Sequence, residues 1–248
     1  MAITSGGTLG TGASSTSASS FTFNTATNTL ASGDHGILIV STDNRSTADG
    51  ETNDHTSVTG ATGTWTKLGE YTNTVGGAAG DGVCVSVWRF VASGTVNTGT
   101  TITINLSGNA TDKTCTFWKF TVGAGNTLVR QGGTTNPVYN TTDASNGFGS
   151  VSFSSLASAN RLYLRGLGKE ANTTTQITNS TNFTVITNNR SRNNASAVYV
   201  SGEFRINTPT GETSNPTLAV TGDTAGVFVA LYESSTGSPS VSPSSSIS

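Results

Sequence analysis

The chain carries two copies of one ordered series of short apolar blocks, and this internal repeat is the strongest constraint on its fold. What recurs is the alternation of apolar residues, and no candidate chemical group recurs with it. The repeat therefore predicts two similar β-units and favours a structural or binding protein over an enzyme. The blocks pair 21–23 with 151–153, 37–40 with 161–164, 64–68 with 182–186, 83–86 with 198–201, 103–108 with 217–222, and 115–120 with 227–232.

The composition favours strands in both halves. Threonine is abundant, and its branched Cβ suits a pleated, half-exposed surface, whereas the charged residues that strands disfavour make up only 10% of the chain. Residues 101–107 alternate polar and apolar side chains, as a strand with one buried face requires, and no stretch has a helical period. We expect an all-β protein of two tandem jelly-roll-like β-sandwiches from an internal duplication, or alternatively one large fused sandwich.

The expected organisation has four parts. Residues 1–19 form a Gly/Ser/Thr tract without a period, which we interpret as an extended N-terminal arm. The first sandwich is expected over 20–132 and the second over 133–236, with a linker near 132–140. The Ser/Pro-rich C-terminal tail, 237–248, cannot bury enough apolar area to fold by itself.

Individual strands are expected wherever apolar alternation is bounded by turn residues. In the first half they cover 20–24, 36–42, 64–71, 82–91, 100–106 and 114–122, with a further short strand over 127–131. In the second half they cover 150–154, 161–167, 182–187, 196–206, 216–221 and 226–233.

One loop is rich in carboxylates and is the candidate metal site. Asp43, Asp49, Glu51 and Asp54 lie close together in sequence, and Ca²⁺ takes oxygen ligands from loops of this kind. Their spacing does not follow the EF-hand order, and the corresponding loop of the second half, 169–175, holds one carboxylate. The interpretation favoured here is a solvated loop without a metal, and no other cofactor is expected.

The residues of enzymatic catalysis are sparse. His35 and His55 are the only histidines, and neither lies in a recognisable nucleophile motif. Cys84 and Cys115 lie inside apolar strand blocks, too few and too far apart for a metal site, and are expected to be buried free thiols rather than a disulfide. We therefore expect no catalytic residues.

Three tryptophans could offer flat faces to a ligand. Trp65 aligns with Phe183 in the repeat, which favours a packing role, and core packing is also the interpretation favoured for Trp88. Trp118 aligns with Ala230 and is therefore specific to the first copy, which makes it the candidate ligand-facing aromatic, although core packing is the interpretation favoured for it too.

The net charge and the N-terminal sequence indicate which partners and which location to expect. The formal net charge of −2 provides no electrostatic footprint for nucleic acid or an anionic membrane. The N-terminus lacks the basic start and apolar stretch of a signal peptide, and no apolar run reaches the length of a membrane span. We expect a protein made in a cytoplasm, with neither nucleic acid nor membrane as its partner.

Several motifs resemble a class of tandem β-sandwich proteins encoded by tailed bacteriophages. They are Leu30-Ala-Ser-Gly-Asp34, Thr64-Trp-Thr-Lys-Leu-Gly69, Val85-Ser-Val-Trp-Arg-Phe90 and Thr101-Ile-Thr-Ile104, and the resemblance spans 20–235. Such proteins are typically virion components: head decoration or cement proteins, minor capsid proteins, or parts of tails and fibres. The resemblance brings no catalytic residues with it.

Three functional hypotheses follow. The first is a non-enzymatic virion protein that decorates or cements the capsid by contacts with the major capsid protein or other virion proteins, with its flexible ends strapped onto neighbours and with a homotrimer as the oligomer suggested by analogy. The second is a tail or fibre module that binds host-surface carbohydrate. The third is a hydrolase that uses the carboxylates of 43–55.

Overall fold

The protein is built from antiparallel β-sheets, as the sequence predicted. A computed structural model describes residues 3–43, 45, 48–74, 82–132, 136–154, 156, 159–170, 175–192, 197–208 and 211–235. All named elements of this part of the chain are strands, which confirms the all-β fold. Within these ranges, no helix is long and apolar enough to cross a bilayer.

The first half forms a sandwich of a larger and a smaller sheet. The larger sheet has the order β1-β8-β3-β6-β5 and the smaller sheet the order β2-β7-β4. The strands are β1 (Thr4–Ser14), β2 (Ala18–Asn24), β3 (His35–Asp43), β4 (His55–Thr59), β5 (Gly63–Thr74), β6 (Gly82–Ala92), β7 (Thr101–Ala110) and β8 (Lys113–Thr121).

The second half repeats this plan. Its larger sheet has the order β10-β16-β12-β14-β13, with β9 also paired to β16, and β11 pairs with β15 in a smaller sheet. The strands are β9 (Asn126–Arg130), β10 (Val138–Gly147), β11 (Val151–Phe153), β12 (Arg161–Glu170), β13 (Thr184–Arg190), β14 (Val198–Asn207), β15 (Glu212–Ser214) and β16 (Thr217–Ser235).

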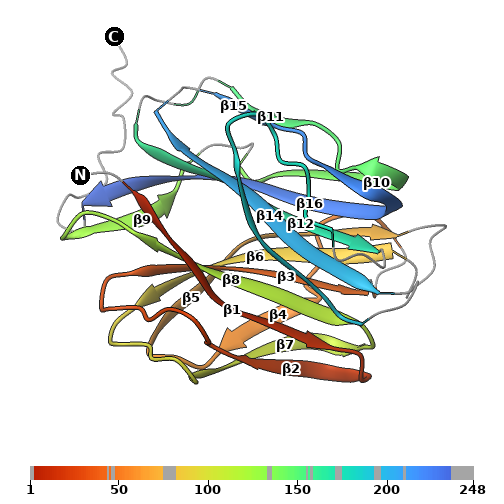
Figure 1. Ribbon diagram of the computed structural model, residues 1–248, viewed down its shortest axis with the longest axis horizontal. Coiled ribbons are helices and arrows are strands. Elements are labelled where there is room, and N and C mark those ends of the chain that lie inside the picture. Colours follow the sequence, from red (N-terminus) through yellow and green to blue (C-terminus); the bar gives the residue numbers. More distant parts are fainter. Residues whose placement is uncertain are drawn as a thin grey trace, which may run out of the picture.

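The four sheets stack in layers, with the two larger sheets facing each other in the middle (Figure 1). The smaller sheets lie on the outside, with β2, β7 and β4 at one end of the stack and β11 and β15 at the other. Each interface between layers holds apolar side chains. The central core therefore joins the halves, while separate clusters fill each sandwich.

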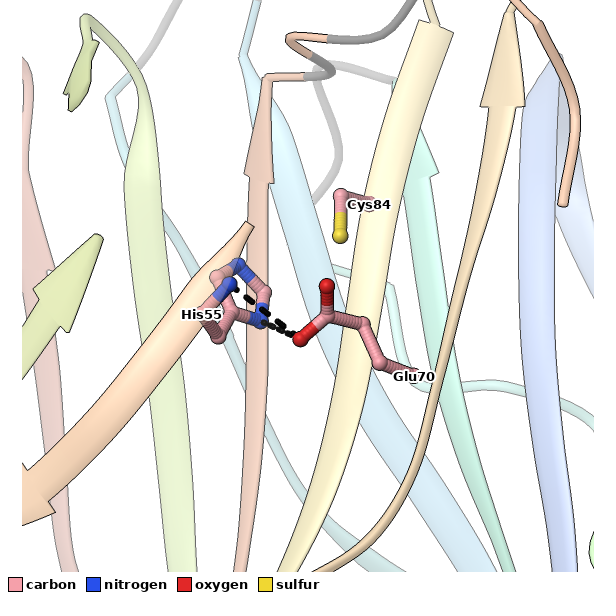
Figure 2. A group of neighbouring side chains, drawn as sticks. All are labelled: His55, Glu70 and Cys84. Carbon is pink, nitrogen blue, oxygen red and sulfur yellow. Dashed lines mark hydrogen bonds and ion pairs between the residues drawn. The ribbon is translucent and has the colours of Figure 1, made fainter. Parts of the chain in front are cut away.

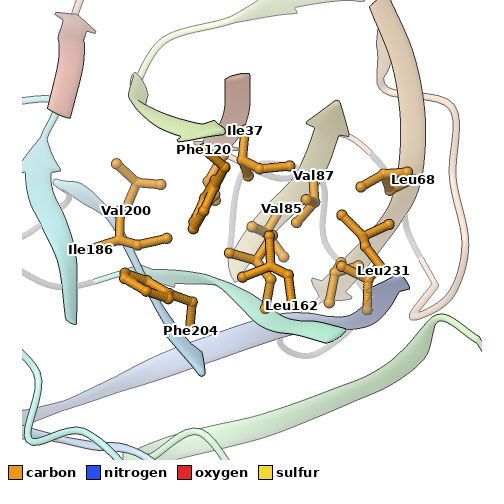
Figure 3. Close-up of a cluster of buried hydrophobic side chains, with 14 of the residues drawn as sticks. Ile37, Leu68, Val85, Val87, Phe120, Leu162, Ile186, Val200, Phe204 and Leu231 are labelled. Carbon is orange, nitrogen blue, oxygen red and sulfur yellow. The ribbon is translucent and has the colours of Figure 1, made fainter. Parts of the chain in front are cut away.

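The central core is made by alternate residues of strands from both halves (Figure 3). Ile37 and Ile39 of β3 pack in it with Leu162 and Leu164 of β12, and all four are fully buried. The intervening residues of β3 point the other way and pack in the core of the first sandwich. Since both faces of β3 are covered, its continuous apolar run reflects burial on two sides.

Glycine lets the two larger sheets approach closely. A Cβ at Gly166 of β12 would lie 2.4 Å from a methyl carbon of Val87 and 3.1 Å from one of Ile39. A Cβ at Gly202 of β14 would lie 2.6 Å from Ile39 Cδ1. These distances are below ordinary van der Waals contact, so side chains of the first half occupy the space that side chains at these two positions would need.

In both larger sheets an edge strand, β1 or β10, pairs with the last strand of its half, β8 or β16, which in turn pairs with β3 or β12. A duplicated unit would produce this agreement, and the duplication itself remains a prediction, as does the division of the chain at 132. Two aligned blocks are out of register. The repeat aligns Ile37 with Arg161, but the residue that packs in the central core as Ile37 does is Leu162. It aligns Cys115 with Val227, but Cys115 packs in the first sandwich and Val227 in the central core. A shift of one residue restores both matches.

The expected N-terminal arm is wrong for Thr4–Ser14, which forms β1 and pairs with β8 along its length. The register shifts at two points, between Ser5 and Gly7 and between Thr8 and Gly10, which removes any simple period. A Cβ at Gly12 would lie 2.4 Å from the Cβ of Phe23, so glycine is needed where β1 lies close to β2. The predicted tail, 237–248, lies outside the described residues.

Other expectations also need correction. The end of the predicted loop, from His55, belongs to β4, and the predicted linker runs into β10 at Val138. The short strand near 127–131 exists as β9, yet it pairs with β16 of the second half. The two strands expected over 216–221 and 226–233 are one strand, because β16 passes through the expected turn by irregular pairing with β10.

Candidate functional site

The structure does not gather the four carboxylates of the predicted Ca²⁺ loop. Asp43 accepts the main-chain N–H of Asp112 at 2.8 Å. Asp49 accepts both the N–H and the hydroxyl of Thr74, at 2.7 and 3.1 Å. Asp43 and Asp49 are therefore each held by a different neighbour. In the described part of the chain, these two acids do not form a common metal-binding group with exposed Glu51 and buried Asp54.

A different group of side chains meets beneath this loop. His55 begins β4, Glu70 lies in β5 and Cys84 lies in β6, and their potential ligand atoms all lie within 4.8 Å of one another. Figure 2 shows the carboxylate of Glu70 between the imidazole and the thiol. All three residues are buried between the two sheets of the first sandwich. Since they combine nitrogen, oxygen and sulfur donors, they form the candidate functional site.

Glu70 is the centre of this cluster because both of its oxygens accept hydrogen bonds. Oε1 accepts the main-chain N–H of Asp54 at 2.5 Å and the hydroxyl of Thr52 at 2.9 Å. Oε2 accepts the main-chain N–H of His55 at 3.1 Å and the ammonium of Lys67 at 2.8 Å. One carboxylate of the larger sheet therefore fixes the chain that enters the smaller sheet.

The imidazole of His55 has a partner at each nitrogen. Trp88 Nε1 donates to Ser86 Oγ at 2.8 Å, which leaves the Ser86 hydroxyl to donate to Nδ1 at 2.6 Å. Thr42 Oγ1 donates to the carbonyl of Asp43 at 3.0 Å and so accepts from Nε2, also at 3.0 Å. With the two hydroxyls oriented in this way, the ring carries its proton on Nε2. Burial lowers the pKa of His55, so the ring is neutral.

The thiol of Cys84 is protonated. Burial and the neighbouring charge of Glu70 raise its pKa well above the ordinary value. The hydroxyls of Thr72 and Thr52 are polar neighbours of the thiol, with Thr52 Oγ1 3.9 Å from the sulfur. A nucleophilic cysteine needs a thiolate and an electropositive, partly exposed setting, and Cys84 has the opposite surroundings.

These residues, as placed, do not fit a metal centre. Metal binding requires a deprotonated thiol and free lone pairs, whereas His55 Nδ1 and both oxygens of Glu70 already accept hydrogen bonds from the protein. An ion would have to displace several of these bonds from a fully buried position. What the arrangement can do is hold loop 48–54 and the start of β4 onto the larger sheet.

The second half contains a comparable buried carboxylate. Glu203 of β14 accepts the main-chain N–H and hydroxyl of Ser180, at 2.7 and 2.6 Å, and the hydroxyl of Ser214 at 2.5 Å. Its cross-strand neighbour is Arg165 of β12, whose pKa burial lowers to about 10. In each half, a glutamate of the larger sheet anchors chain that belongs to the smaller sheet, although the two glutamates occupy different strands.

The remaining sequence candidates have structural surroundings. Cys84 and Cys115 are free and buried, as predicted, and lie on β6 and β8, which β3 separates. Trp118 is half-buried: its ring centroid lies 6.1 Å from that of Phe204 in β14, and its indole N–H donates to Ser5 Oγ at 2.7 Å. Trp118 therefore contributes to packing at the edge of the central core.

Sequence reasoning missed Glu70 and Glu203. The usable signal was a single acidic residue inside an otherwise apolar or hydroxyl-rich strand, because a carboxylate is buried there only if several donors surround it. Comparison with known proteins found no matching family model, no matching curated protein and no matching solved structure.

Proposed function

We propose that the chain is a non-enzymatic structural protein of a tailed-phage virion, which decorates or cements the capsid through protein–protein contacts. The resemblance of 20–235 to tandem β-sandwich virion proteins supports the proposal. The observation that carries it is the central core, in which the larger sheets of both halves cover each other's apolar faces. A block joined in this way holds its loops and edge strands at fixed separations, as a protein that bridges neighbouring subunits requires.

The candidate site is consistent with this role. The polar atoms of His55 and Glu70 bond inward to the protein's own main chain and hydroxyls, so the cluster acts as a fastening between sheets. Rigid loops reduce the conformational entropy lost when a protein docks on a partner. The cluster would thus keep 48–54 in a conformation ready for contact.

The partners in this proposal are the major capsid protein or other virion proteins, together with further copies of this chain. A homotrimer is the oligomer suggested by analogy with decoration and fibre proteins. Strapping by an N-terminal arm is withdrawn, because Thr4–Ser14 is part of the larger sheet. The C-terminal tail, 237–248, is the segment proposed to reach a neighbour.

Immunogold electron microscopy of the native particles, with antibody against the purified chain, tests this proposal. Label spread over the head is the expected result. Label confined to the tail or its fibres would replace capsid decoration with the host-recognition function considered next, and particles without label would refute a place in the virion.

The second candidate, a tail or fibre module that binds host-surface carbohydrate, is favoured by one polar hollow of about 460 Å³. Amide, hydroxyl and charged side chains, the kinds that hydrogen-bond sugar hydroxyls, line it: Asn179, Ser180, Thr181, Asn182, Arg205, Glu212, Thr213 and Asn215.

A glycan array tests this candidate with a matched pair of variants. Asn182 has a φ of 66° and Ala61, in the other half, has a φ of 63°, so glycine is tolerated at both positions. Carbohydrate binding should be lost in Asn182→Gly and kept in Ala61→Gly. Absence of binding by the unaltered protein, or equal binding by both variants, would remove the hollow as a glycan site.

A further inference from the structure

A second hollow, of about 240 Å³, lies where the two halves meet, between β5 and β6 of the first half and β9, which pairs with the second half. Three of its lining residues are cationic in a chain that has only 12 lysines and arginines. The lining residues are Thr66, Lys67, Leu68, Arg89, Val129 and Arg130.

The two arginines bond to main-chain carbonyls and to no carboxylate among the described residues. Arg89 Nη1 donates to the carbonyl of Leu128, and Arg130 Nη1 donates to that of Leu68 at 3.1 Å. Arg89 Nε is buried and has no partner in this part of the structure. Burial also lowers the pKa of Arg89, which means that its charge is partly removed from water without a compensating anion.

The groups around the hollow leave it positively charged. The ammonium of Lys67 bonds Glu70 Oε2 at 2.8 Å and Asn53 Oδ1 at 2.9 Å and lies over the ring of Trp88, so the charge of the hollow comes from its two guanidinium groups. His35, which accepts the main-chain N–H of Leu128 at 3.3 Å, is neutral because burial and Arg89 lower its pKa to about 4. The other nearby acid, Glu51, acts on the phenol of Tyr139.

We infer that this hollow binds a tetrahedral oxyanion, phosphate or sulfate, between the guanidinium groups of Arg89 and Arg130. Guanidinium groups present planar pairs of N–H donors that match two oxygens of such an ion. The ion would connect β6 to β9 and so fasten the first half to the sheet of the second. This inference is independent of whether the chain is part of a virion.

Thermal unfolding in sulfate and in chloride, at equal ionic strength, tests the inference. The melting temperature of the unaltered protein should rise with sulfate concentration and then follow the logarithm of concentration, as a bound ligand requires. Arg130→Gln should weaken sulfate binding roughly tenfold or more, because one charge-assisted hydrogen bond is lost.

Arg45→Gln is the matched control, since Arg45 also donates to a main-chain carbonyl, that of Asn109, and also has a buried Nε without a partner among the described residues. It should keep the full sulfate effect. Equal sulfate effects in the unaltered protein and in Arg130→Gln would overturn the inference, because sulfate stabilises folded proteins generally by exclusion from their surfaces.

Val129→Glu provides a second test if Arg130→Gln folds poorly. It places a carboxylate on the lining of the hollow, where it should compete with the ion and abolish the sulfate effect. A full sulfate effect in this variant would count against the site.

Isothermal titration with inorganic sulfate, inorganic phosphate and a sulfated oligosaccharide then shows whether the bound oxyanion is a free ion or part of a larger ligand. Tighter binding of the oligosaccharide, lost in Arg130→Gln, would assign the oxyanion to a larger ligand, whereas binding of the inorganic ions alone would assign a free ion. Binding of none of the three would overturn the inference.

Discussion

The carboxylate of Glu70 accepts the main-chain N–H of His55 at 3.1 Å, so a side chain of the larger sheet holds the first residue of a strand in the smaller sheet. Glu70 is 3% exposed, and its oxygens also accept from Asp54, Thr52 and Lys67. Together with the hydrogen bonds of His55 to Thr42 and Ser86, the contact links the two sheets of the first sandwich. Its removal therefore tests whether the cluster is a structural fastening.

Glu70→Ala should lower the free energy of unfolding by about 3–5 kcal/mol, because buried donors lose their acceptor and Lys67 loses its counter-charge. Urea unfolding measures the change. The control is Glu212→Ala, which breaks the more exposed ion pair with Arg205 and should cost about 1 kcal/mol or less. Equal losses in the two variants would contradict the assigned role.

Much of the fold could be predicted from apolar alternation, and the exceptions have physical causes. β3 and β6 are buried on both faces and therefore stand out as apolar runs. β1 was missed because glycine carries no side chain that could show a period, although the close approach of Phe23 requires it. β10 was missed because its sequence is almost wholly polar.

The candidate site was less predictable than the fold. His55 was noticed as an imidazole, but its partner Glu70 lies 15 residues further along the chain. Pairing of β5 with β6 places Glu70 near Cys84, and packing of the smaller sheet on the larger one brings His55 of β4 to them. The pairing register depends on packing throughout the sandwich, so local sequence patterns do not determine it.

Gly166→Ala should destabilise the protein by about 1–3 kcal/mol, because its new Cβ would overlap a methyl group of Val87 across the central core. Thermal unfolding measures the loss. Gly94→Ala is the control, since a Cβ there would lie 3.6 Å from Thr62, an ordinary contact. A second substitution, Val87→Ala, should recover part of the stability lost in Gly166→Ala. If the two stability changes simply add in the double variant, residue 87 does not contact the new Cβ at position 166 directly.

His35 should make the protein less stable in acid. Its folded-state pKa of about 4 lies below the ordinary value of 6.5, so the unfolded state binds more protons between these values. Its contribution is complete above pH 6.5 and is lost as pH falls toward 4, by up to about 3 kcal/mol. Asp43 makes stability depend on pH in the opposite direction. Its pKa is raised to about 6 in the folded protein, so its contribution to stability is lost as pH rises.

The difference between the unaltered protein and His35→Gln isolates the histidine, because the contribution of Asp43 is common to both. Unfolding free energies measured from pH 4 to pH 8 should fall toward acid less steeply in His35→Gln. Parallel pH profiles would show that His35 does not titrate as its burial requires.

The two cysteines should be unreactive in the folded protein. Cys84 and Cys115 are fully buried, and burial raises the pKa of both thiols. A disulfide-exchange reagent should therefore modify neither thiol under native conditions and both in denaturant. Ser152→Cys, at an exposed position of β11, is the control that should react at once. Rapid native modification of either natural thiol would contradict the burial of its strand.

The two ends of the chain should differ in what they contribute. Deleting 1–19 removes β1 and leaves β8 with an unpaired edge, so it should lower the melting temperature or prevent folding. Deleting 237–248 should leave the melting temperature unchanged and, under the proposed virion role, reduce incorporation into particles. Calorimetry and incorporation assays measure the two effects separately. Normal melting without 1–19 would contradict the placement of β1, whereas full incorporation without 237–248 would exclude the tail as a strap.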